Sequence, residues 1–462
     1  MGELPFSSER MLMATFHRAP GTDAPLTALA KGAPRRMLAR CARVRTADGE
    51  APLDVAAHAA VMAANDALAA RGLRVLAMAA GPVRDTSDEA LRDLVLLGLV
   101  GMTDPPAPGV PETIAALRDA GIRTVMLTGD QRLTAQAIAG ALGVTAPGEA
   151  TVDGREVDAM TPDALAARVD RIGAFSRVSP EAKLRIVDAL RTRGAIVAML
   201  GDGVNDAPAL RRADVGVAMG RRGTDVAKEA AGVVLTDDRF PTIAGAVEEG
   251  RVIHANIRRF VFYLLSCNLG EILVLLGAGV AGLPAPLLPL QILWLNLVTD
   301  TFPALALAFE PADADVMRRP PRDPRAPLLS RRMLLASAGH AAVIAAVTLA
   351  ALLYGLSGAA ADAPRAVTLS FMTLALAQLA HLTNARRLSR ASGHRPANPY
   401  AIGALLLTLG LQLLAVYAPP LARVLGVVPL GARDWLVVGA LSLVPAAVGV
   451  VARATRGPSG ER

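Results

Sequence analysis

The sequence is short of aromatic residues and of cysteine. Aromatic side chains make up 3% of the 462 residues, and the arginines are spread along the chain. The net charge of +7 therefore does not indicate a nucleic-acid interface, which needs basic and aromatic side chains together. The two cysteines, Cys41 and Cys267, lie far apart, which excludes a disulfide framework and a CxxC metal site and fits a reducing compartment. We expect no nucleic acid among the partners.

The second half of the chain lacks charge over long stretches. Hydrophobic residues make up 53% of the sequence, and they concentrate after residue 260. A stretch of about 20 apolar residues is long enough to span a bilayer. A buried core helix is the alternative for any one stretch, but six in succession indicate a membrane domain, expected at residues 251–455. The six expected spans are roughly 260–280, 287–308, 333–356, 366–385, 400–419 and 434–452.

The connections between these stretches differ in charge. Arginines are frequent in 318–332 and 385–395, whereas 281–286 and 357–365 carry almost no charge. The connection 420–433, with two arginines, is a mild exception. Because arginine and lysine favour cytoplasmic loops, this pattern places the first half of the chain and both termini in the cytoplasm. The N-terminal MGELPF does not resemble a secretory leader, and we expect an integral protein of the plasma (inner) membrane, in contact with lipid.

From residue 94 onward, short apolar runs alternate with helical patterns. The run LVLLGLVGM is followed by PETIAALRDAG, and RTVMLTGD by TAQAIAGALG. This alternation predicts a doubly wound parallel sheet whose functional turns follow the carboxyl ends of the strands. Ser179 as N-cap, Pro180 at the first helical position and Gly194 after the end bracket one predicted helix. We therefore expect an α/β domain at residues 94–250, followed by the membrane α-helical domain.

Three predicted turns or helix starts carry residues suited to phosphoryl chemistry. Thr128 to Asp130 close one strand and open a helix, where a hydroxyl and backbone N–H groups can bind phosphate oxygens. Lys183, on the first turns of a later helix, can offer a positive charge to the same phosphate. Asp202 and Asp206, in LGDGVNDAPAL, follow a buried strand and can hold Mg²⁺, which takes one or two protein carboxylates and keeps several waters. Each signal alone is weak, but their order in one chain is specific.

In that order the motifs resemble those of a known family, the P-type ATPases, whose phosphorylation domain has the haloacid-dehalogenase-like fold. The motifs are DPP at 104–106, MLTGD at 126–130, SRVSPEAK at 176–183 and GDGVNDAPAL at 201–210. Upstream, PFSSER, KGAP and GLRVLAMA resemble the family's nucleotide-binding domain, a part of which we expect at residues 1–93. The resemblance covers essentially the whole chain.

The resemblance implies ATP and Mg²⁺ as cofactors and gives roles to individual residues. It implies that Phe6 stacks on adenine and that Lys31 and Arg74 line the ATP site. Asp104 and Arg177, in the matched DPP and SRVSPEAK motifs, are expected at the same nucleotide site. The catalytic residues that the matched motifs imply are Thr128, Gly129, Asp130, Lys183, Asp202, Asn205 and Asp206.

Polar residues inside the predicted spans are the second informative feature. A charged residue at the bilayer centre costs about 2.5 to 3.5 kcal/mol on insertion scales. Asn268 and Glu271 in the first span, and Asn296, Thr299 and Asp300 in the second, are spaced so that each set shares a helix face. Counted from the span ends, both acids lie near the midplane of the hydrocarbon core. Such oxygen ligands suit Ca²⁺ and suit Cu⁺ or Zn²⁺ poorly, whereas hydrogen bonding between helices leaves the two acids unexplained.

The resemblance extends to these spans and implies a transported ion. NLGE and NLVTD resemble the fifth and sixth spans of the calcium-pumping branch, in which these side chains coordinate Ca²⁺. Gln378 aligns with a position that is Glu in the pumps with two sites, which favours one ion per cycle over two. Transport of protons, sodium or Mn²⁺ stays an alternative. The expected metal ligands are Asp202 for Mg²⁺ and, for the transported ion, Asn268, Glu271, Asn296, Thr299, Asp300 and Gln378.

The sequence contains no DKTG, the motif whose aspartate is phosphorylated in the family, and neither a TGE loop nor a PEGL-type broken span. Without a nucleophile there is no phosphoenzyme. We favour the explanation that the chain is the C-terminal part of a split pump or a truncated sequence, inactive alone, with a separate N-terminal half carrying DKTGT as its expected partner. A non-catalytic membrane protein with a degenerate cytoplasmic domain is the alternative. A phosphatase that uses Asp104 is the third explanation, disfavoured by the two prolines that follow this residue.

Overall fold

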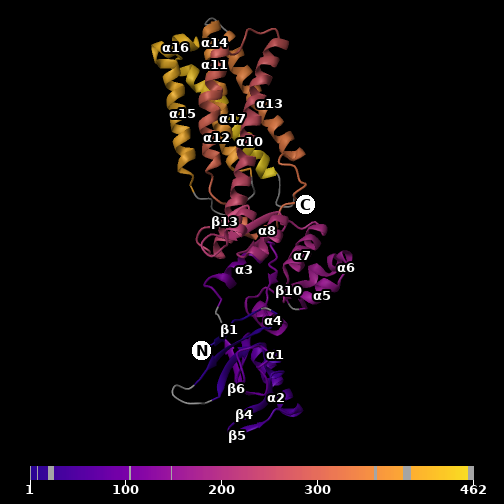
Figure 1. The fold of residues 1–462 in the computed structure, drawn as a ribbon. Helices are drawn as coiled ribbons and strands as arrows, with labels where there is room; N and C mark the ends of the chain where they lie inside the picture. Colours follow the sequence, from indigo (N-terminus) through magenta and orange to yellow (C-terminus); the bar gives the residue numbers. More distant parts are fainter. Residues whose placement is uncertain are drawn as a thin grey trace. The chain divides into compact units, whose positions relative to one another are not determined.

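The structure is a computed structural model. It describes residues 2–7, 9–18, 25–102, 106–146, 148–357, 362–388 and 397–455. The chain divides into two compact units, Met1–Ala244 and Gly245–Arg462. The first unit contains the described strands together with helices, and the described part of the second is built of helices (Figure 1).

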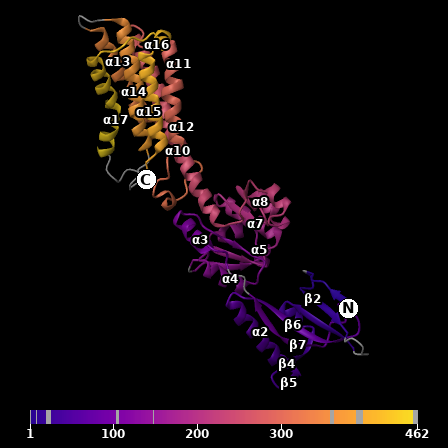
Figure 2. The same ribbon diagram turned by 90° about the vertical axis from the view of Figure 1, so that its left-hand side faces the viewer.

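Seven strands in the first unit form one sheet in the order β1-β2-β3-β6-β7-β4-β5. All neighbours in this sheet are antiparallel except β4 and β7. Every second residue of β2 and β6 is buried, as expected for strands with one covered face. Residues of helices α1 and α2 pack against that face, and Figure 2 shows α2 beside the sheet. The bounds are β1 (Gly2–Leu4), β2 (Leu12–His17), β3 (Leu26–Gly32), α1 (Pro34–Leu38), β4 (Cys41–Thr46), β5 (Gly49–Pro52), α2 (Val55–Ala70), β6 (Arg74–Val83) and β7 (Leu94–Met102).

The pairing of β7 differs from the expectation. The sequence pattern assigns residues 94–102 to the α/β domain, but β7 pairs with β6 in antiparallel orientation and with β4 in parallel orientation. An apolar run predicts a buried strand but does not reveal which strand it pairs with. Along most of its length β7 pairs with β6, the preceding strand in the sequence. The N-terminal sheet therefore extends past the expected limit at residue 93.

The rest of the first unit alternates strands and helices, as predicted. Its strands are all parallel, but they form two sheets of three rather than one, in the orders β8-β10-β9 and β11-β12-β13. Leu127 and Leu190 pack against the hydrophobic clusters of both sheets. The strands are β8 (Met126–Leu127), β9 (Ala150–Asp153), β10 (Ile172–Ser176), β11 (Ala198–Gly201), β12 (Val215–Met219) and β13 (Val233–Leu235), and the helices are α3 (Val110–Asp119), α4 (Arg132–Ala141), α5 (Gly154–Ala159), α6 (Pro162–Arg168), α7 (Pro180–Thr192), α8 (Ala207–Arg212) and α9 (Asp225–Ala230).

The described part of the second unit contains six helical segments that are long and apolar enough to cross a membrane, as predicted. The first, α10, begins at Pro241, well before the expected span, because the charged residues ahead of the span do not interrupt the helix. The second is built from α11, a π-helix over Leu295–Asp300, and α12. The bounds are α10 (Pro241–Val280), α11 (Pro289–Trp294), α12 (Thr301–Ala308), α13 (Arg331–Leu356), α14 (Ala363–Arg386), α15 (Pro399–Tyr417), the short α16 (Pro419–Leu425) and α17 (Ala432–Thr455).

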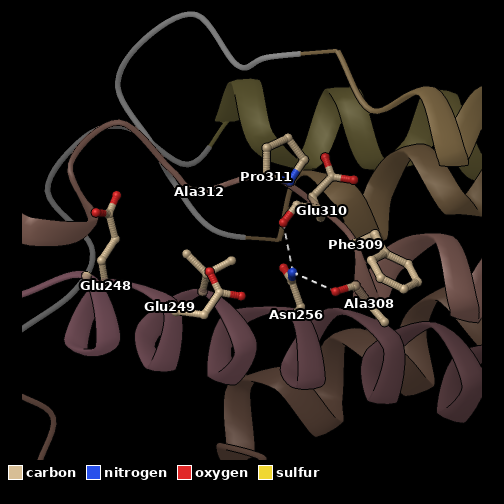
Figure 3. A pocket seen from close by; sticks show the side chains of 10 residues that line it. Glu248, Glu249, Asn256, Ala308, Phe309, Glu310, Pro311 and Ala312 are labelled. Atoms are coloured by element: carbon tan, nitrogen blue, oxygen red, sulfur yellow. Dashed lines mark hydrogen bonds between the residues drawn. The ribbon is translucent and has the colours of Figure 1, made fainter. Parts of the chain in front are cut away.

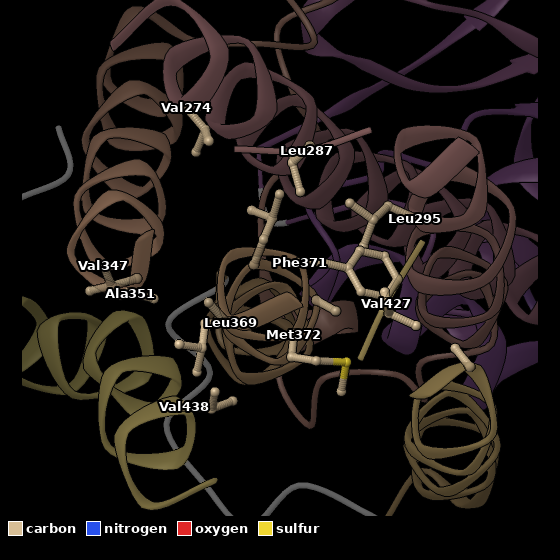
Figure 4. Close-up of a cluster of buried hydrophobic side chains, with 14 of the residues drawn as sticks. Val274, Leu287, Leu295, Val347, Ala351, Leu369, Phe371, Met372, Val427 and Val438 are labelled. Carbon is tan, nitrogen blue, oxygen red and sulfur yellow. The ribbon is translucent and has the colours of Figure 1, made fainter. Parts of the chain in front are cut away.

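Helix α14 forms the centre of the bundle. It is the most enclosed of the six spans, and it packs mainly against α13 and α17. Figure 4 shows its Leu369, Phe371 and Met372 among apolar side chains from the surrounding segments. A fully apolar helix is expected in such a position, so the polar residues that α14 carries need separate explanation.

Candidate functional site

The turn after β8 is held by its own side chains. Thr128 Oγ1 donates a hydrogen bond to Asp130 Oδ2 at 3.0 Å and accepts one from the backbone N–H of Asp130 at 3.1 Å. The turn also meets the segment between β10 and α7, where the N–H groups of Arg177 and Val178 donate to the carbonyls of Asp130 and Thr128, both at 3.1 Å. The predicted phosphate turn, including Gly129, therefore lies beside the start of α7.

The loop after β11 joins the same edge through a salt bridge. Lys183 Nζ, on α7, lies 2.5 Å from Asp206 Oδ1. Asp206 is buried, and its other oxygen accepts hydrogen bonds from the N–H groups of Asp202 and Gly203 at 3.3 and 3.2 Å. Asp206 thus neutralises Lys183 and shapes the loop that presents Asp202.

Asp202 and Asn205 point to solvent in this loop. The carbonyl of Asp202 accepts a hydrogen bond from Thr224 N at 2.8 Å, which fixes its backbone and leaves its carboxylate exposed. In the described part of the chain no three His, Cys, Asp or Glu side chains gather into a metal site. The arrangement fits Mg²⁺, which is held by one or two carboxylates and completes its shell with water and phosphate oxygens.

Arg177 and Asp104 are the two other residues expected at the nucleotide site, and the structure describes only Arg177. Arg177 has a φ of 49°, a conformation that is uncommon for a residue with a side chain. Its guanidinium lies 4.0 Å from Asp153, and a Cβ added to Gly154 would meet its carbonyl oxygen. Asp104 lies outside the described residues.

The residues expected at adenine and ATP lie on or beside the uncovered face of the seven-stranded sheet. Lys31 on β3 pairs with Met78 on β6, and Arg74 lies four residues before Met78 on the same face. Lys31 and Arg74 are exposed, as is Phe6 in the segment after β1. Apolar residues on this face are also exposed, including Met78 and Met102, which pairs with Arg74. An exposed face that combines cations with apolar side chains can bind a phosphorylated aromatic ligand.

Within the helical bundle, the predicted ion ligands gather from three segments. Gln378 Nε2 on α14 donates to Glu271 Oε1 on α10 at 2.9 Å, and Asn268 Nδ2 on α10 donates to Asp300 Oδ2 at 3.3 Å. Glu271, Asp300 and Gln378 are buried, and Asn268 lies about one helical turn before Glu271 on α10. The structure therefore brings four of the six predicted ligands into one cluster.

The π-helix carries the remaining two, which behave differently. Thr299 is buried, and its Oγ1 accepts a hydrogen bond from Gln412 Nε2 on α15 at 2.9 Å. Asn296 is exposed and donates to the carbonyl of Ile292 in its own helix at 3.1 Å. Asn296 is thus turned away from the cluster in this structure.

Sequence reasoning missed Tyr263 and the π-helix. Pro303 has no N–H, so the carbonyl of Thr299, four residues earlier, has no helical donor. The hydroxyl of Tyr263 donates to this carbonyl at 3.0 Å. A π-helical turn is rare and is frequent at functional sites, and the signal for it was the proline that follows Asp300.

A second polar region lies where α10 enters the bundle. A cavity of about 310 Å³ is lined there by Glu248, Glu249, Asn256 and Glu310, among others (Figure 3). Asn256 Nδ2 donates to the carbonyls of Ala308 and Glu310 at 3.1 and 2.8 Å. The Glu310 carboxylate is bound by side chains of α14 and of the segment before α15. Asn256 and Glu310 therefore belong to a buried structural network, whereas Glu248 and Glu249 are exposed.

The sequence matches three family models along most of its length. They are described as P-type ATPase, cytoplasmic domain N (residues 1–109), haloacid dehalogenase-like hydrolase (82–214) and cation transporting ATPase, C-terminus (284–454). The first two overlap at residues 82–109, the range that contains β7.

Individual proteins are similar over the same range. A calcium-transporting ATPase of Bacillus subtilis is 40% identical over 96% of this chain and 50% of its own length. The human calcium-transporting ATPase type 2C member 2 is 38% identical over 94% of this chain and 45% of its own length, and a probable cation-transporting ATPase F of Mycobacterium tuberculosis is 50% identical over 72% and 38%. The chain spans about half the length of the curated relatives it matches. It is an integral membrane protein and belongs to the P-type cation-transporting ATPases, of which it carries the C-terminal region.

Proposed function

We propose that the chain is the ion-binding and phosphoryl-handling part of an ATP-driven pump that moves Ca²⁺ across the plasma (inner) membrane, with its first unit in the cytoplasm. The observation that carries the proposal is the cluster of Glu271, Asp300, Gln378 and Asn268 in the bundle, of which the first three are buried. Two carboxylates and two amides form a hard oxygen site of the kind that Ca²⁺ prefers. Because Gln378 is neutral, we propose one Ca²⁺ per cycle.

The first unit supplies the chemistry for ATP in this proposal. ATP binds the exposed face that carries Lys31 and Arg74, and Mg²⁺ binds Asp202 with a phosphate oxygen. The TGD turn and Lys183 stabilise the charge on the transferring phosphoryl group, for which positioning and electrostatics are the main contributions of a protein. The meeting of these elements at one edge supports this assignment.

The acceptor aspartate is proposed to come from a segment that this sequence does not contain. In the described residues β8 and β11 are end strands of their sheets, and each leads into a functional turn. A further parallel strand beside either one would bring its carboxyl end between Thr128 and Asp202. Strand addition of this kind satisfies the free edges of both sheets, and we propose an N-terminal half carrying DKTGT as the donor.

The membrane site points to a further segment as well. Asn268 and Asn296 are exposed on the bundle surface. An amide that faces lipid is costly, so we propose that additional helices cover this side of the bundle.

Calcium binding to the chain alone tests the ion site. We expect the full chain in lipid nanodiscs to bind ⁴⁵Ca²⁺ and Glu271→Gln with Asp300→Asn to abolish the binding, because the amides alone cannot balance the ion's charge. Glu248→Gln, an exposed acid at the end of the bundle, is the matched control and should bind as the parent does. Equal binding by the double variant would contradict the assignment.

Phosphorylation tests the catalytic half. Alone, the chain should give no acid-stable, hydroxylamine-sensitive label from γ-labelled ATP. Co-expressed with an N-terminal half that carries DKTGT, it should give a Ca²⁺-dependent label that Asp202→Asn removes. Calcium binding without any label in the complex would favour the alternative, a non-catalytic ion-binding membrane protein.

A further inference from the structure

The connection between α15 and α17 carries arginines where few are expected. Arg423 lies on α16 and Arg433 near the start of α17, and both are exposed. Helix α15 is the fifth span, so it ends opposite to the side on which α10 enters the bundle (Figure 1). Arginine is disfavoured at the ends of spans on the non-cytoplasmic side. Its presence on this side therefore needs a physical reason.

A groove lies directly beside Arg423. It has a volume of about 440 Å³, and its lining is mostly apolar, with Val416, Ala422, Val427 and Val428 among its residues. Arg423 is the charged residue of the lining. An apolar space lined by one cation fits an apolar ligand with an anionic end.

The walls of the groove are fixed to the bundle. Gln291 Nε2 on α11 donates to the carbonyl of Leu425 at 3.0 Å, and Thr368 Oγ1 on α14 accepts a hydrogen bond from Val428 N, also at 3.0 Å. Gly426, between them, has a φ of 61°, and a Cβ there would approach Leu288 to 2.7 Å. Since these contacts hold both ends of the turn, the groove is preformed.

Two aromatic residues place the groove at the membrane surface. Tyr417, which lines it, accepts a hydrogen bond from Trp435 Nε1 at 2.8 Å. Tyrosine and tryptophan concentrate where lipid headgroups meet the hydrocarbon core. A lipid in the groove would therefore have its phosphate at the level of Arg423.

The charge of Arg423 is not balanced within the described residues. Its Nε donates to the carbonyl of Pro419 at 3.1 Å, and no described carboxylate forms an ion pair with it. Asp434, the acid of this connection, is bound by Arg365 at 2.5 Å. The outer N–H groups of Arg423 are consequently available to an anion.

We propose that this groove binds an anionic phospholipid of the non-cytoplasmic leaflet, with one acyl chain along the apolar lining and the phosphate on Arg423. A soluble phosphate would leave the apolar lining uncovered, and the ammonium group of a zwitterionic lipid would offset the attraction. The proposal rests on the proposed orientation of the bundle, with the first unit in the cytoplasm, and does not depend on pumping.

Quenching of Trp435 fluorescence by brominated lipids tests the site. The sequence has two tryptophans, so Trp294→Phe leaves Trp435 as the sole reporter. The full chain is reconstituted in phosphatidylcholine vesicles that contain brominated phosphatidylglycerol or brominated phosphatidylcholine. We expect brominated phosphatidylglycerol to bind about fivefold more strongly than brominated phosphatidylcholine, because one arginine near an anionic headgroup contributes about 1 kcal/mol. Arg423→Gln should reduce the ratio to about one, whereas Arg433→Gln, outside the groove, should keep it.

A second variant tests the apolar part. Ala422→Phe fills the groove and should reduce quenching by both brominated lipids, while circular dichroism shows that the helices are intact. Equal quenching by the two lipids, or equal loss in Arg423→Gln and Arg433→Gln, would overturn the proposal. If inorganic phosphate abolished the preference for phosphatidylglycerol, the site would bind the free anion. If all quenching were lost as the protein-to-lipid ratio rises, a second copy of the chain would occupy the groove. Either result would also overturn the proposal.

Discussion

At the scale of single residues, the phosphoryl site depends on one close approach in the GDGVND loop. A Cβ added to Gly201 would lie 2.5 Å from the Cβ of Asp206 and 2.8 Å from its Cγ. The substitution Gly201→Ala would therefore displace Asp206 from Lys183. We expect it to destabilise this part of the fold by about 1 to 3 kcal/mol, the range for overpacking, measured as faster hydrogen exchange in β11 and the following loop. Gly203→Ala is the matched control, because its Cβ would lie at an ordinary 3.6 Å from Asp206.

Asp238 fixes the backbone beside the same loop. Its carboxylate accepts hydrogen bonds from the N–H groups of Arg221 and Arg222, each at 2.9 Å. These hydrogen bonds hold the pKa of Asp238 below its ordinary value. The same segment continues to Thr224, whose N–H binds the carbonyl of Asp202. Protonation of Asp238 is thus expected to loosen the support of the metal-binding turn.

The direction of the pH effect follows from the lowered pKa of Asp238. Its stabilisation is present above the unfolded pKa of about 3.9 and is lost as the pH falls through the lower, folded pKa. After correction for intrinsic rates, the amides of Arg221 and Arg222 should exchange faster once the pH falls below the folded pKa. Asp238→Asn should show the faster exchange already at neutral pH, and the exposed Asp225→Asn should not. Protection that persists in Asp238→Asn would contradict this role.

At the scale of elements, the π-helix sets the position of Asp300. The substitution Pro303→Ala restores an N–H that can bind the carbonyl of Thr299 and favours an ordinary α-helical turn. We expect Asp300 to turn away from Asn268 as a result and Ca²⁺ binding in nanodiscs to weaken about tenfold or more, as when the residues that orient ligands are lost. Pro289→Ala, at the start of α11, is the control and should bind Ca²⁺ like the parent. Unchanged affinity in Pro303→Ala would show that the π-helix has another cause.

The elements also show where sequence reasoning succeeds. The six spans, the capped start of α7 and the turns after β8 and β11 were predictable, because hydropathy and capping are local properties. The partners of β7 and the contact of Gln412 with Thr299 were not, because a local pattern does not reveal which segments pair. The π-helix was missed although its signal, Pro303, lies close to it in the sequence. Asn296 had the correct spacing for an ion ligand, but the wider π-helical turn changes which side chains share a face.

At the scale of the whole chain, a buried polar network fastens the segment between α12 and α13 to the first span of the bundle. Arg259 on α10 is 2% exposed and binds both oxygens of Asp313 at 3.0 and 3.1 Å, and it also donates to Asn256 at 2.6 Å. The sequence pattern alone does not reveal this pair, because the two residues lie 54 positions apart. All three residues of the network belong to the second unit, so its integrity matters to the bundle.

Removal of Asp313, the buried partner of Arg259, should destabilise the bundle. Asp313→Ala leaves the Arg259 guanidinium charged and buried, and we expect the bundle to lose about 3 to 5 kcal/mol of stability, as for other buried pairs in which one partner is removed. Asp315→Ala is the matched control: its pair with Arg319 is partly exposed and should contribute at most about 1 kcal/mol. Thermal unfolding of the reconstituted chain, followed by tryptophan fluorescence, compares the two. Similar unfolding temperatures for both variants would mean that water or another group compensates the charge of Arg259. The pair of Arg259 and Asp313 would then not be what holds the segment between α12 and α13 against α10.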